Sequence, residues 1–529
     1  MAQHRAMKRV FPLEAVVLVL LSCSHRVTAV APEIRPSTAT QSGPLALRLI
    51  AFNDVHGHLE PEPSGPGAPP AHYGHGGVTS LAREVRTLRA QVQNAFVVSA
   101  GDLFGASPLL SSMFEHVPTV SAMNALGLDV AGVGNHEFDR GPAALKTALA
   151  GAKFEVLGAN VSGPNGAIFP AYTVKEVEGV PVAFIGLTTR DTRSLVLGER
   201  IVGINFGDEA KAVNDVVAQL RPRGIEAFVV LIHEGGTQHG GLNDCNGLKG
   251  RIGGIVAQLS PAVDVIVSGH THAAYNCVLS GKPVTSALSY ARMVTRIDLT
   301  LDRATHEVTQ VEAENRVVPD GPQDAAVLAA IAPYQAKAAP VVNRIVGRVT
   351  ATVHEHENAD GESELGSLVA DAQWEATRAA GAEFALVNAG GLRNDLPYVA
   401  ERGGALRYAE VHAAQPFGNA LVTMSISGKA LMRAVSAAMF DGQGLIQVSN
   451  NVAVRWSGGK LVSMTVNGTS VAEEATYRVT VNEYMAGLSP WKSGSKLAVG
   501  ISDTEALVAF LVRGAVSPTP AAAARIKKM

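Results

Sequence analysis

Five short apolar runs in the first half of the chain each lead into residues that can bind a metal ion or carry a proton. The runs lie at 47–52, 95–99, 130–133, 227–232 and 263–268. Runs of this length and composition indicate buried strands, and open α/β sheets place their sites on loops beyond the carboxyl ends of such strands. Helical periodicity between several of the runs, as at 78–91 and 118–126, predicts an α/β fold with these loops gathered at one site.

The polar residues after these runs form a set of candidate metal ligands. The set consists of Asp54, His56, Asp102, Asn135, His233, His270 and His272. Carboxylates, imidazoles and an amide oxygen together suit Mn, Zn, Fe or Co better than Ca or Mg. The set is too large for one tetrahedral site and suffices for two sites that share a carboxylate. We therefore expect two divalent metal ions, whose positive field would attract a phosphate dianion and polarise a water.

The stretch Gly-Asn-His-Glu-Phe-Asp at 134–139 adds a group for acid–base chemistry. His136 has no place in the ligand set and can carry a proton at neutral pH, so we expect it to stabilise or protonate an ester. Asp139 can fix the ring of His136 by a hydrogen bond. A lone histidine is more often structural, but five such strings favour convergence on a catalytic site.

These strings resemble the signature of calcineurin-like metallophosphoesterases. With Asn-Ala-Gly-Gly-Leu-Arg at 388–393, the chain resembles the bacterial 5′-nucleotidase family from about residue 45 onward. The resemblance implies an α/β (α+β) protein with an N-terminal metallophosphoesterase β-sandwich flanked by helices over 45–320. An interdomain helix over 321–344 and a C-terminal α/β nucleotide-binding domain over 345–515 would follow. Two domains also suit the length of 529 residues.

The resemblance further implies roles for individual residues. The first metal's ligands match Asp54, His56, Asp102 and His272. The second metal's ligands match Asp102, Asn135, His233 and His270. The catalytic pair matches His136 and Asp139. In the family, metal-activated water releases phosphate from a nucleotide, so we expect a metal-dependent phosphoric ester hydrolase.

Residues of the second domain match positions that hold the nucleotide in the family. Asn388 and Arg393 match phosphate- and ribose-contacting positions, and Gly391 lies in the same turn. Phe417 matches one of two aromatic residues that clasp the base, and Tyr484 is the candidate for the other.

Three departures from the family pattern predict an altered nucleoside pocket. Ala359 stands where an arginine is usual, and Glu364 stands where an asparagine is usual. After Tyr484, Gly-Leu-Ser-Pro-Trp at 487–491 replaces the usual Gly-Gly-Asp, and Trp491 could supply an aromatic face instead of Tyr484. Nucleotide sugars, cyclic nucleotides or another ester therefore remain alternative substrates, and an inactive surface-binding protein is the alternative from another class.

The amino end predicts export. A basic start at 4–9 precedes an apolar run at 15–21, far shorter than the ~20 residues that span a bilayer, so a signal peptide is predicted over 1–31. Leu-Leu-Ser-Cys at 20–23 resembles a lipobox and would put a lipid on Cys23. Cleavage near Ala29 or Ala31 is the alternative. We expect a periplasmic or cell-surface protein with no transmembrane span.

The remaining expectations concern cysteines, partners and the chain's end. In an exported protein Cys245 and Cys277 favour a disulfide, the alternative being two free buried thiols. A net charge of −3 gives no reason to expect a nucleic acid polymer as partner.

Two loop regions are expected to be exposed or disordered. His58, His72 and His75 are expected to be solvated loop residues, and the tail at 517–529 is expected to be disordered.

Overall fold

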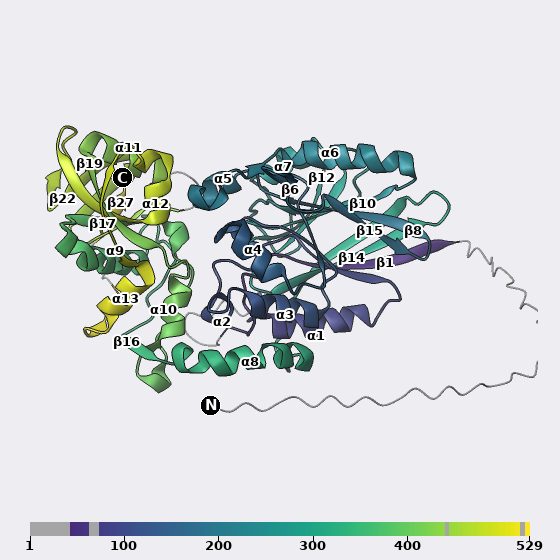
Figure 1. Cartoon of the computed structure of the whole chain (residues 1–529), viewed down its shortest axis with the longest axis horizontal. Helices are drawn as coiled ribbons and strands as arrows, with labels where there is room; N and C mark the ends of the chain where they lie inside the picture. The colour runs from purple at the N-terminus through teal and green to yellow at the C-terminus, as the bar shows by residue number, and fades with distance from the viewer. Residues whose placement is uncertain (1–42, 63–72, 440–443, 519–523) are drawn as a thin grey trace, which may run out of the picture. The chain divides into compact units, whose positions relative to one another are not determined.

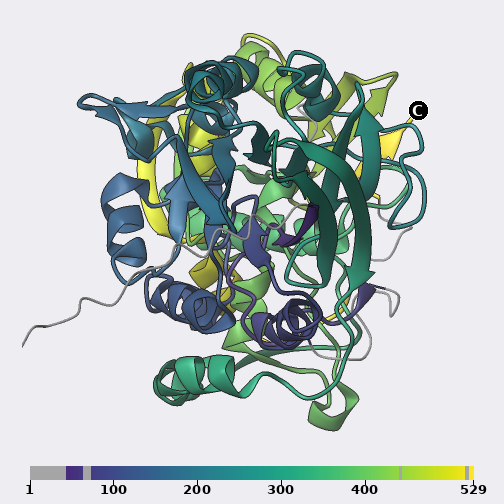
Figure 2. The same ribbon diagram turned by 90° about the vertical axis from the view of Figure 1, so that its right-hand side faces the viewer.

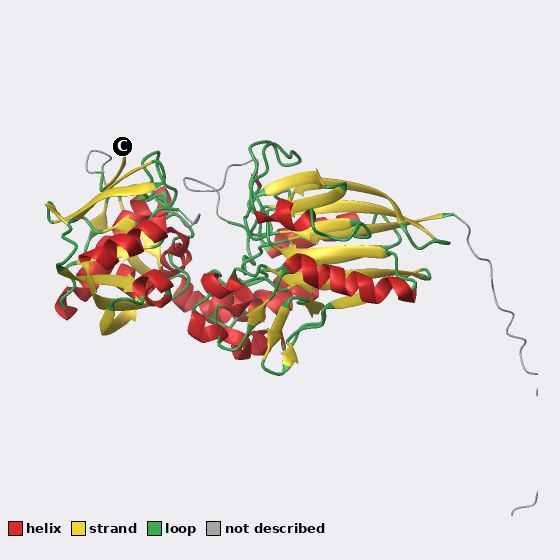
Figure 3. Cartoon of the chain, turned by 90° about the horizontal axis from the view of Figure 1, so that it is seen from above, coloured by secondary structure: helices red, strands yellow, loops and turns green. Residues whose placement is uncertain are grey.

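The computed structural model describes residues 43–62, 73–439, 444–518 and 524–529. The predicted signal peptide, Cys23 and His72 lie outside the described residues. The described chain is a mixed α/β protein with two-domain architecture (Figure 1). Helices lie outside the strands when the chain is viewed from the end (Figure 2), and both halves contain helices as well as strands (Figure 3).

Two six-stranded sheets build the N-terminal half. In sheet order, the first contains β15 (Val308–Val317), β14 (Met293–Asp302), β1 (Pro44–Phe52), β2 (Ala95–Ser99), β3 (Val130–Gly132) and β4 (Glu155–Leu157). The second contains β12 (Ala274–Leu279), β13 (Lys282–Ala287), β11 (Val265–Ser268), β10 (Ala227–His233), β8 (Val180–Thr188) and β7 (Tyr172–Val177). A small third sheet contains β6 (Gly166–Ala167), β5 (Val161–Gly163) and β9 (Asn205–Phe206).

Helices cover the outer faces of these two sheets. The helices of this half are α1 (Val78–Arg89), α2 (Leu109–Ser112), α3 (Val117–Leu126), α4 (Gly141–Leu149), α5 (Thr192–Leu195), α6 (Glu209–Leu220) and α7 (Arg251–Val256), and α8 (Ala325–Val342) follows them and packs on other helices. In Figure 1, α1 and α3 lie beyond one sheet, and α6 and α7 lie beyond the other. The predicted β-sandwich flanked by helices is therefore confirmed.

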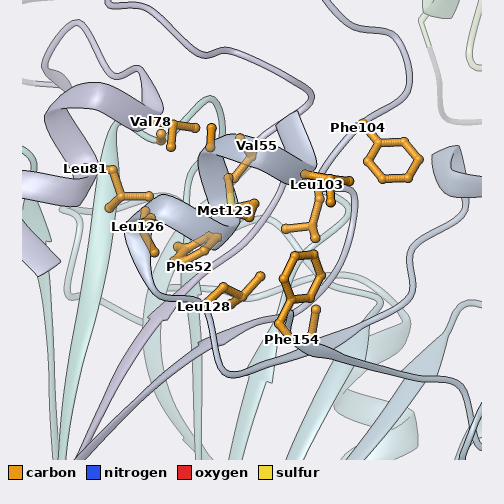
Figure 4. Packing of buried hydrophobic residues seen from close by; sticks show 14 of the residues in the cluster. Phe52, Val55, Val78, Leu81, Leu103, Phe104, Met123, Leu126, Leu128 and Phe154 are labelled. Carbon is orange, nitrogen blue, oxygen red and sulfur yellow. The ribbon is translucent and has the colours of Figure 1, made fainter. Parts of the chain in front are cut away.

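The side-chain alternation of β1 shows why the sandwich forms. Leu47 and Leu49 pack in a core made by strands of both sheets, together with side chains such as Phe184 of β8. Ile50 and Phe52 point the other way, into the core beneath the helices, where Figure 4 shows Phe52 among the side chains of neighbouring elements. A strand apolar on both faces must be covered on both faces, because successive side chains point to opposite sides.

The described residues of the C-terminal half form three sheets. The largest contains β20 (Gln447–Val448), β17 (Phe384–Val387), β24 (Thr476–Asn482), β19 (Ala420–Ser427) and β25 (Ser495–Ser502). The others contain β18 (Ala405–Arg407), β16 (Ile345–Val349) and β26 (Ala515–Val516), and β23 (Thr469–Ser470), β22 (Lys460–Val466), β21 (Val452–Ser457) and β27 (Ile526–Lys528). The helices are α9 (Glu364–Thr377), α10 (Tyr408–Ala414), α11 (Gly428–Met439), α12 (Glu483–Gly487) and α13 (Asp503–Leu511).

Helix α8 lies within the range 321–344 that the sequence predicted for the interdomain helix. The side chain of Asp324 caps it by accepting from the backbone N–H of Ala326 and Val327 at 3.0 Å, and Arg86 of α1 donates to the same carboxylate. Within the described ranges, α8 is one helix whose length and mean hydropathy of 1.3 would suffice to cross a membrane. It packs against α3 and α1.

The expectation that the tail is disordered was wrong for its last residues. Strand β27 pairs in parallel with β21, and Ile526 is fully buried. Arg525 is also buried, and it forms a two-pronged ion pair with Asp371 of α9 at 2.8 and 3.0 Å. These partners are distant in sequence, so the composition of the tail alone gave no sign of them.

The predicted disulfide is confirmed: Cys245, in the loop after β10, is bonded to Cys277 on β12. Cys277 is buried in the apolar core of the second sheet. The bond therefore ties the loop beyond His233 to the strand that follows His272.

Candidate metal centre and catalytic site

The candidate ligands stand at the carboxyl ends of parallel strands in both sheets. Asp54, Asp102 and Asn135 follow β1, β2 and β3, which are parallel neighbours in the first sheet. His233 ends β10, and the loop with His270 and His272 follows its parallel neighbour β11. Because parallel strands end at one edge, the two sheets deliver these side chains to one place.

Most of these residues have a backbone conformation that is unfavourable for residues other than glycine. Five have φ between 49° and 73°, namely Asp54, His56, Asp102, His270 and His272. Such left-handed residues are uncommon and mark positions where surrounding structure imposes the conformation. The loops are thus bent so that their side chains turn towards the strand ends.

The side chains form two clusters with ligand atoms within 4.8 Å of one another. The clusters are Asp54, His56 and His272, and Asp102, His233 and His270. Asp102 Oδ2 lies 2.9 Å from Nε2 of His233 and 3.6 Å from Nε2 of His56. One carboxylate oxygen thus faces both clusters, which is the position of a bridging ligand.

Backbone carbonyls fix the orientation of two imidazole rings. Nδ1 of His56 donates to the carbonyl of Gly105, and Nδ1 of His233 donates to the carbonyl of Ala100, both at 2.8 Å. Each ring therefore turns its Nε2 towards its cluster. Metal-binding histidines commonly have such a partner on the other nitrogen.

The residues present fit divalent metal ions. Asn135 Oδ1 is buried without a hydrogen-bond partner, as expected for an atom that awaits a cation. Burial lowers the pKa of His233, yet the acidic side chains around it, chiefly Asp102 and also Asp54 and Glu137, together outweigh this effect and raise that pKa to about 10. The two buried carboxylates thus attract positive charge strongly enough to place it on a buried imidazole. Metal ions would supply the same charge through the same atoms.

His136 and Asp139 form the predicted pair beside the clusters. Nδ1 of His136 lies 2.8 Å from Oδ2 of Asp139. Burial lowers the pKa of His136, but the carboxylates of Asp139 and Asp102 more than compensate, so the pKa lies above its ordinary value. The other ring nitrogen, Nε2, lies 3.4 Å from a guanidinium nitrogen of Arg393.

Of the predicted nucleotide-binding residues, Arg393 and Phe417 lie beside His136. The guanidinium of Arg393 lies 5.2 Å from the centre of the Phe417 ring, and that ring lies 5.9 Å from the ring of His136. Asn388 Oδ1 accepts from Asn482 at 2.9 Å, and a Cβ at Gly391 would lie 3.2 Å from this same oxygen. The hydroxyl of Tyr484 donates to the carbonyl of Ser194 at 3.5 Å.

The prediction that Trp491 could offer an aromatic face to a base was wrong. Its side chain is fully buried in the apolar core of the C-terminal half. The unusual stretch that carries it therefore fills the core. Glu364 also has a local role, because its Oε2 accepts from the backbone N–H of His354 at 3.0 Å. Ala359 is exposed.

Sequence reasoning missed two buried groups at the site. Glu137 accepts from the backbone N–H of Gly134 at 2.6 Å and of Leu103 at 2.7 Å, so it holds the loop that carries Asp102. His58, expected in a solvated loop, is 7% exposed and stacks on Tyr290 at 3.9 Å between ring centres. Glu137 lies inside a motif already singled out, whereas nothing in the local sequence indicated the His58 contact.

Comparison with known families assigns both halves of the chain. Residues 47–274 match the calcineurin-like phosphoesterase family, and residues 345–491 match the C-terminal domain of 5′-nucleotidase. The chain belongs to the 5′-nucleotidase family. It is therefore a metal-dependent phosphoester hydrolase, in agreement with the two clusters.

Similar proteins come from several bacteria. The chain is 31% identical over 88% of its length to Endonuclease YhcR of Bacillus subtilis, but it spans only 39% of that protein. It is 24% identical to a 5′-nucleotidase of Vibrio cholerae, with 83% of this chain and 84% of that protein covered. A solved structure of a 5′-nucleotidase precursor from Thermus thermophilus shares its fold, with a TM-score of 0.78, 26% identity and 92% and 99% coverage.

Proposed function

We propose that the protein is an exported 5′-nucleotidase that releases phosphate from nucleotides at a dinuclear metal centre. The observation that carries this proposal is the position of Arg393 and Phe417 beside His136. Arg393 Nε is buried without a hydrogen-bond partner, and a guanidinium can bind a phosphate or ribose through its planar set of donors. Phe417 is partly exposed, which leaves part of its ring open for a base to stack.

In this proposal, different residues bind the metal ions, act on the ester and hold the nucleotide. When bound, two ions of the Mn, Zn, Fe or Co class supply the Lewis acidity that makes water nucleophilic at neutral pH. Their ligands are the seven residues from Asp54 to His272 named above, with Asp102 shared. His136 stabilises or protonates the ester, and Asp139 orients its ring. Asn388, Gly391 and Tyr484 complete the proposed nucleotide pocket.

Export to the periplasm or cell surface is part of the proposal. The Cys245–Cys277 bond supports it, because disulfides persist in oxidising compartments. A relative that is 27% identical over 93% of this chain is named Cell wall protein Lmo0130, from Listeria monocytogenes. Whether Cys23 carries a lipid is decided by mass spectrometry of the mature amino end.

A hydrolysis panel with metal-reconstituted protein, read by phosphate release and by chromatography of the products, tests the proposed substrate class. The panel contains nucleoside mono-, di- and triphosphates, nucleotide sugars, cyclic nucleotides, single-stranded DNA and an aryl phosphate. A nucleotide should have the highest kcat/KM, and single-stranded DNA should not be cut. Preference for any of the other esters would overturn the nucleotidase assignment while keeping the hydrolase.

Two variants test the binding roles. Arg393→Ala and Phe417→Ala should lower kcat/KM for the nucleotide, with the stacking part about 1–3 kcal/mol. In Phe417→Ala, hydrolysis of the aryl phosphate should change little, because that substrate carries no base to stack on the ring. In Arg393→Ala, it should fall only if the guanidinium binds the phosphate and not the ribose. Arg433→Ala, which removes an exposed arginine of α11, is the matched control. Equal losses on both substrates in Phe417→Ala would contradict the stacking role, and unchanged kcat/KM in Arg393→Ala would contradict its binding role.

A further inference from the structure

A third group of metal-ligating side chains lies in the C-terminal half, outside the dinuclear centre. It consists of His354, His356 and Asp395, each of which offers a ligand atom within 4.8 Å of the others. The rings of the two histidines lie 5.0 Å apart between centres. Neither the family roles inferred from the sequence nor the catalytic geometry uses any of these residues.

Backbone pairing builds this group. Val353 and Leu396 form an antiparallel bridge in which each backbone N–H donates to the other's carbonyl at 3.0 Å. The bridge brings the segment before α9 against the turn that follows Arg393. His354 and Asp395 are the immediate neighbours of the bridged residues, so they meet across it. The arrangement therefore rests on main-chain hydrogen bonds and not on the chance rotamers of long surface side chains.

The group is also partly organised before any ion binds. Asp395 Oδ2 lies 2.8 Å from Nδ1 of His354, and its Oδ1 accepts from the backbone N–H of Glu355 at 2.8 Å. The carboxylate is therefore held on two sides. The side chains of His354 and Asp395 are 41% and 15% exposed, and His356 is exposed, so an ion and its water ligands can enter from solvent.

We propose that His354, His356 and Asp395 form a third metal site that takes a transition ion such as Zn²⁺. Two imidazoles and one carboxylate are the ligand set of open zinc sites, in which water completes the coordination. Imidazole ligands favour Zn²⁺ over Mg²⁺ and Ca²⁺, which prefer oxygen. A bound ion would tie the segment before α9 to the turn that carries Arg393, because its ligands come from both.

Zinc binding to the full chain tests this site directly. Equilibrium dialysis against a series of Zn²⁺ concentrations gives the number of ions bound per chain and their affinities. His356→Ala and Asp395→Asn should each weaken one zinc site at least about 10-fold and leave the others unchanged. His239→Ala removes another exposed histidine and should bind as wild type. The same series with Mg²⁺ should show no such site.

Asp102→Asn separates this proposal from the dinuclear centre. That variant should lose affinity at the dinuclear centre and keep the site that responds to His356→Ala. If His356→Ala and Asp395→Asn both bind zinc as the wild type does, the third site does not exist. If both lose every ion, the effect belongs to the fold or the dinuclear centre, and the proposal is overturned as well.

Discussion

At the scale of single residues, we propose that His136 acts on the ester and not on the ions. Its Nδ1 lies 2.8 Å from Asp139, and its other nitrogen faces Arg393. His136→Ala should lower kcat about 10²–10⁴-fold, because general acid–base help of this size disappears. Metal content measured by elemental analysis should stay at the wild-type level. Loss of both metals, or full activity, would contradict this role.

The buried carboxyl group of Asp503, at the start of α13, should make the free energy of unfolding depend on pH. Burial raises the pKa of Asp503 from 3.8 to about 7. Between these values the folded state binds more protons than the unfolded state, so the free energy of unfolding falls as pH rises from about 4 to 7. Asp503→Asn should remove this penalty, which is about 4 kcal/mol at pH 8. Denaturant unfolding of both proteins at pH 5 and pH 8 measures it. An equal difference at the two pH values would be the contrary result.

At the scale of elements, the disulfide ties the loop that follows His233 to the strand that follows His272. The bonded cysteines are 32 residues apart, and closing a loop of this length contributes about 3–4 kcal/mol to the free energy of unfolding. The double variant Cys245→Ser/Cys277→Ser should lose stability in this range, and reductant should not weaken it further. Wild-type protein treated with reductant should unfold at the same denaturant concentration as the variant. An unchanged midpoint in the variant would contradict this contribution to stability.

The same scale shows what the sequence could and could not predict. Strand β2 and helix α3 begin and end within one residue of their predicted limits, because apolar runs and helical periods express local rules. Strand β27 was missed, since it pairs with β21 and lies beside the ion pair between Arg525 and Asp371, and these partners are far apart in sequence. The side chain of Trp491 was wrongly expected to face a base. The residues around an aromatic side chain can be the same whether it faces solvent or packs in the core.

Prediction of the site had a similar limit. The metal clusters could be predicted because each ligand follows an apolar strand, and strand ends converge by topology. The role of Glu137 could not be predicted, since it depends on backbone N–H donors, which have no sequence pattern of their own. The third cluster could not be predicted either, since it depends on an antiparallel bridge. His354, for instance, lies opposite Asp395 only because Val353 pairs with Leu396.

For the whole molecule, metal binding should raise the stability of the folded chain. The ligands come from both sheets of the sandwich, so the unfolded chain cannot reproduce the site. An ion at 100 times its Kd adds about 2.7 kcal/mol per site to the free energy of unfolding. Tm should therefore fall when a chelator is added and recover with Mn²⁺ or Zn²⁺. Asp102→Asn should reduce this response. A Tm that is independent of metal would contradict occupation of the centre.

The left-handed backbone at the ligands has a consequence for attempts to engineer this protein. Each such residue costs roughly 1–2 kcal/mol relative to an ordinary conformation, and glycine would avoid that cost. His272, with φ of 53°, is one of these positions. A library screened for heat resistance alone, in the presence of a chelator that removes the stabilising ions, would therefore enrich glycine at the very positions that bind metal. Such a screen would select thermally stable proteins that lack catalytic activity, unless every round also selected for activity.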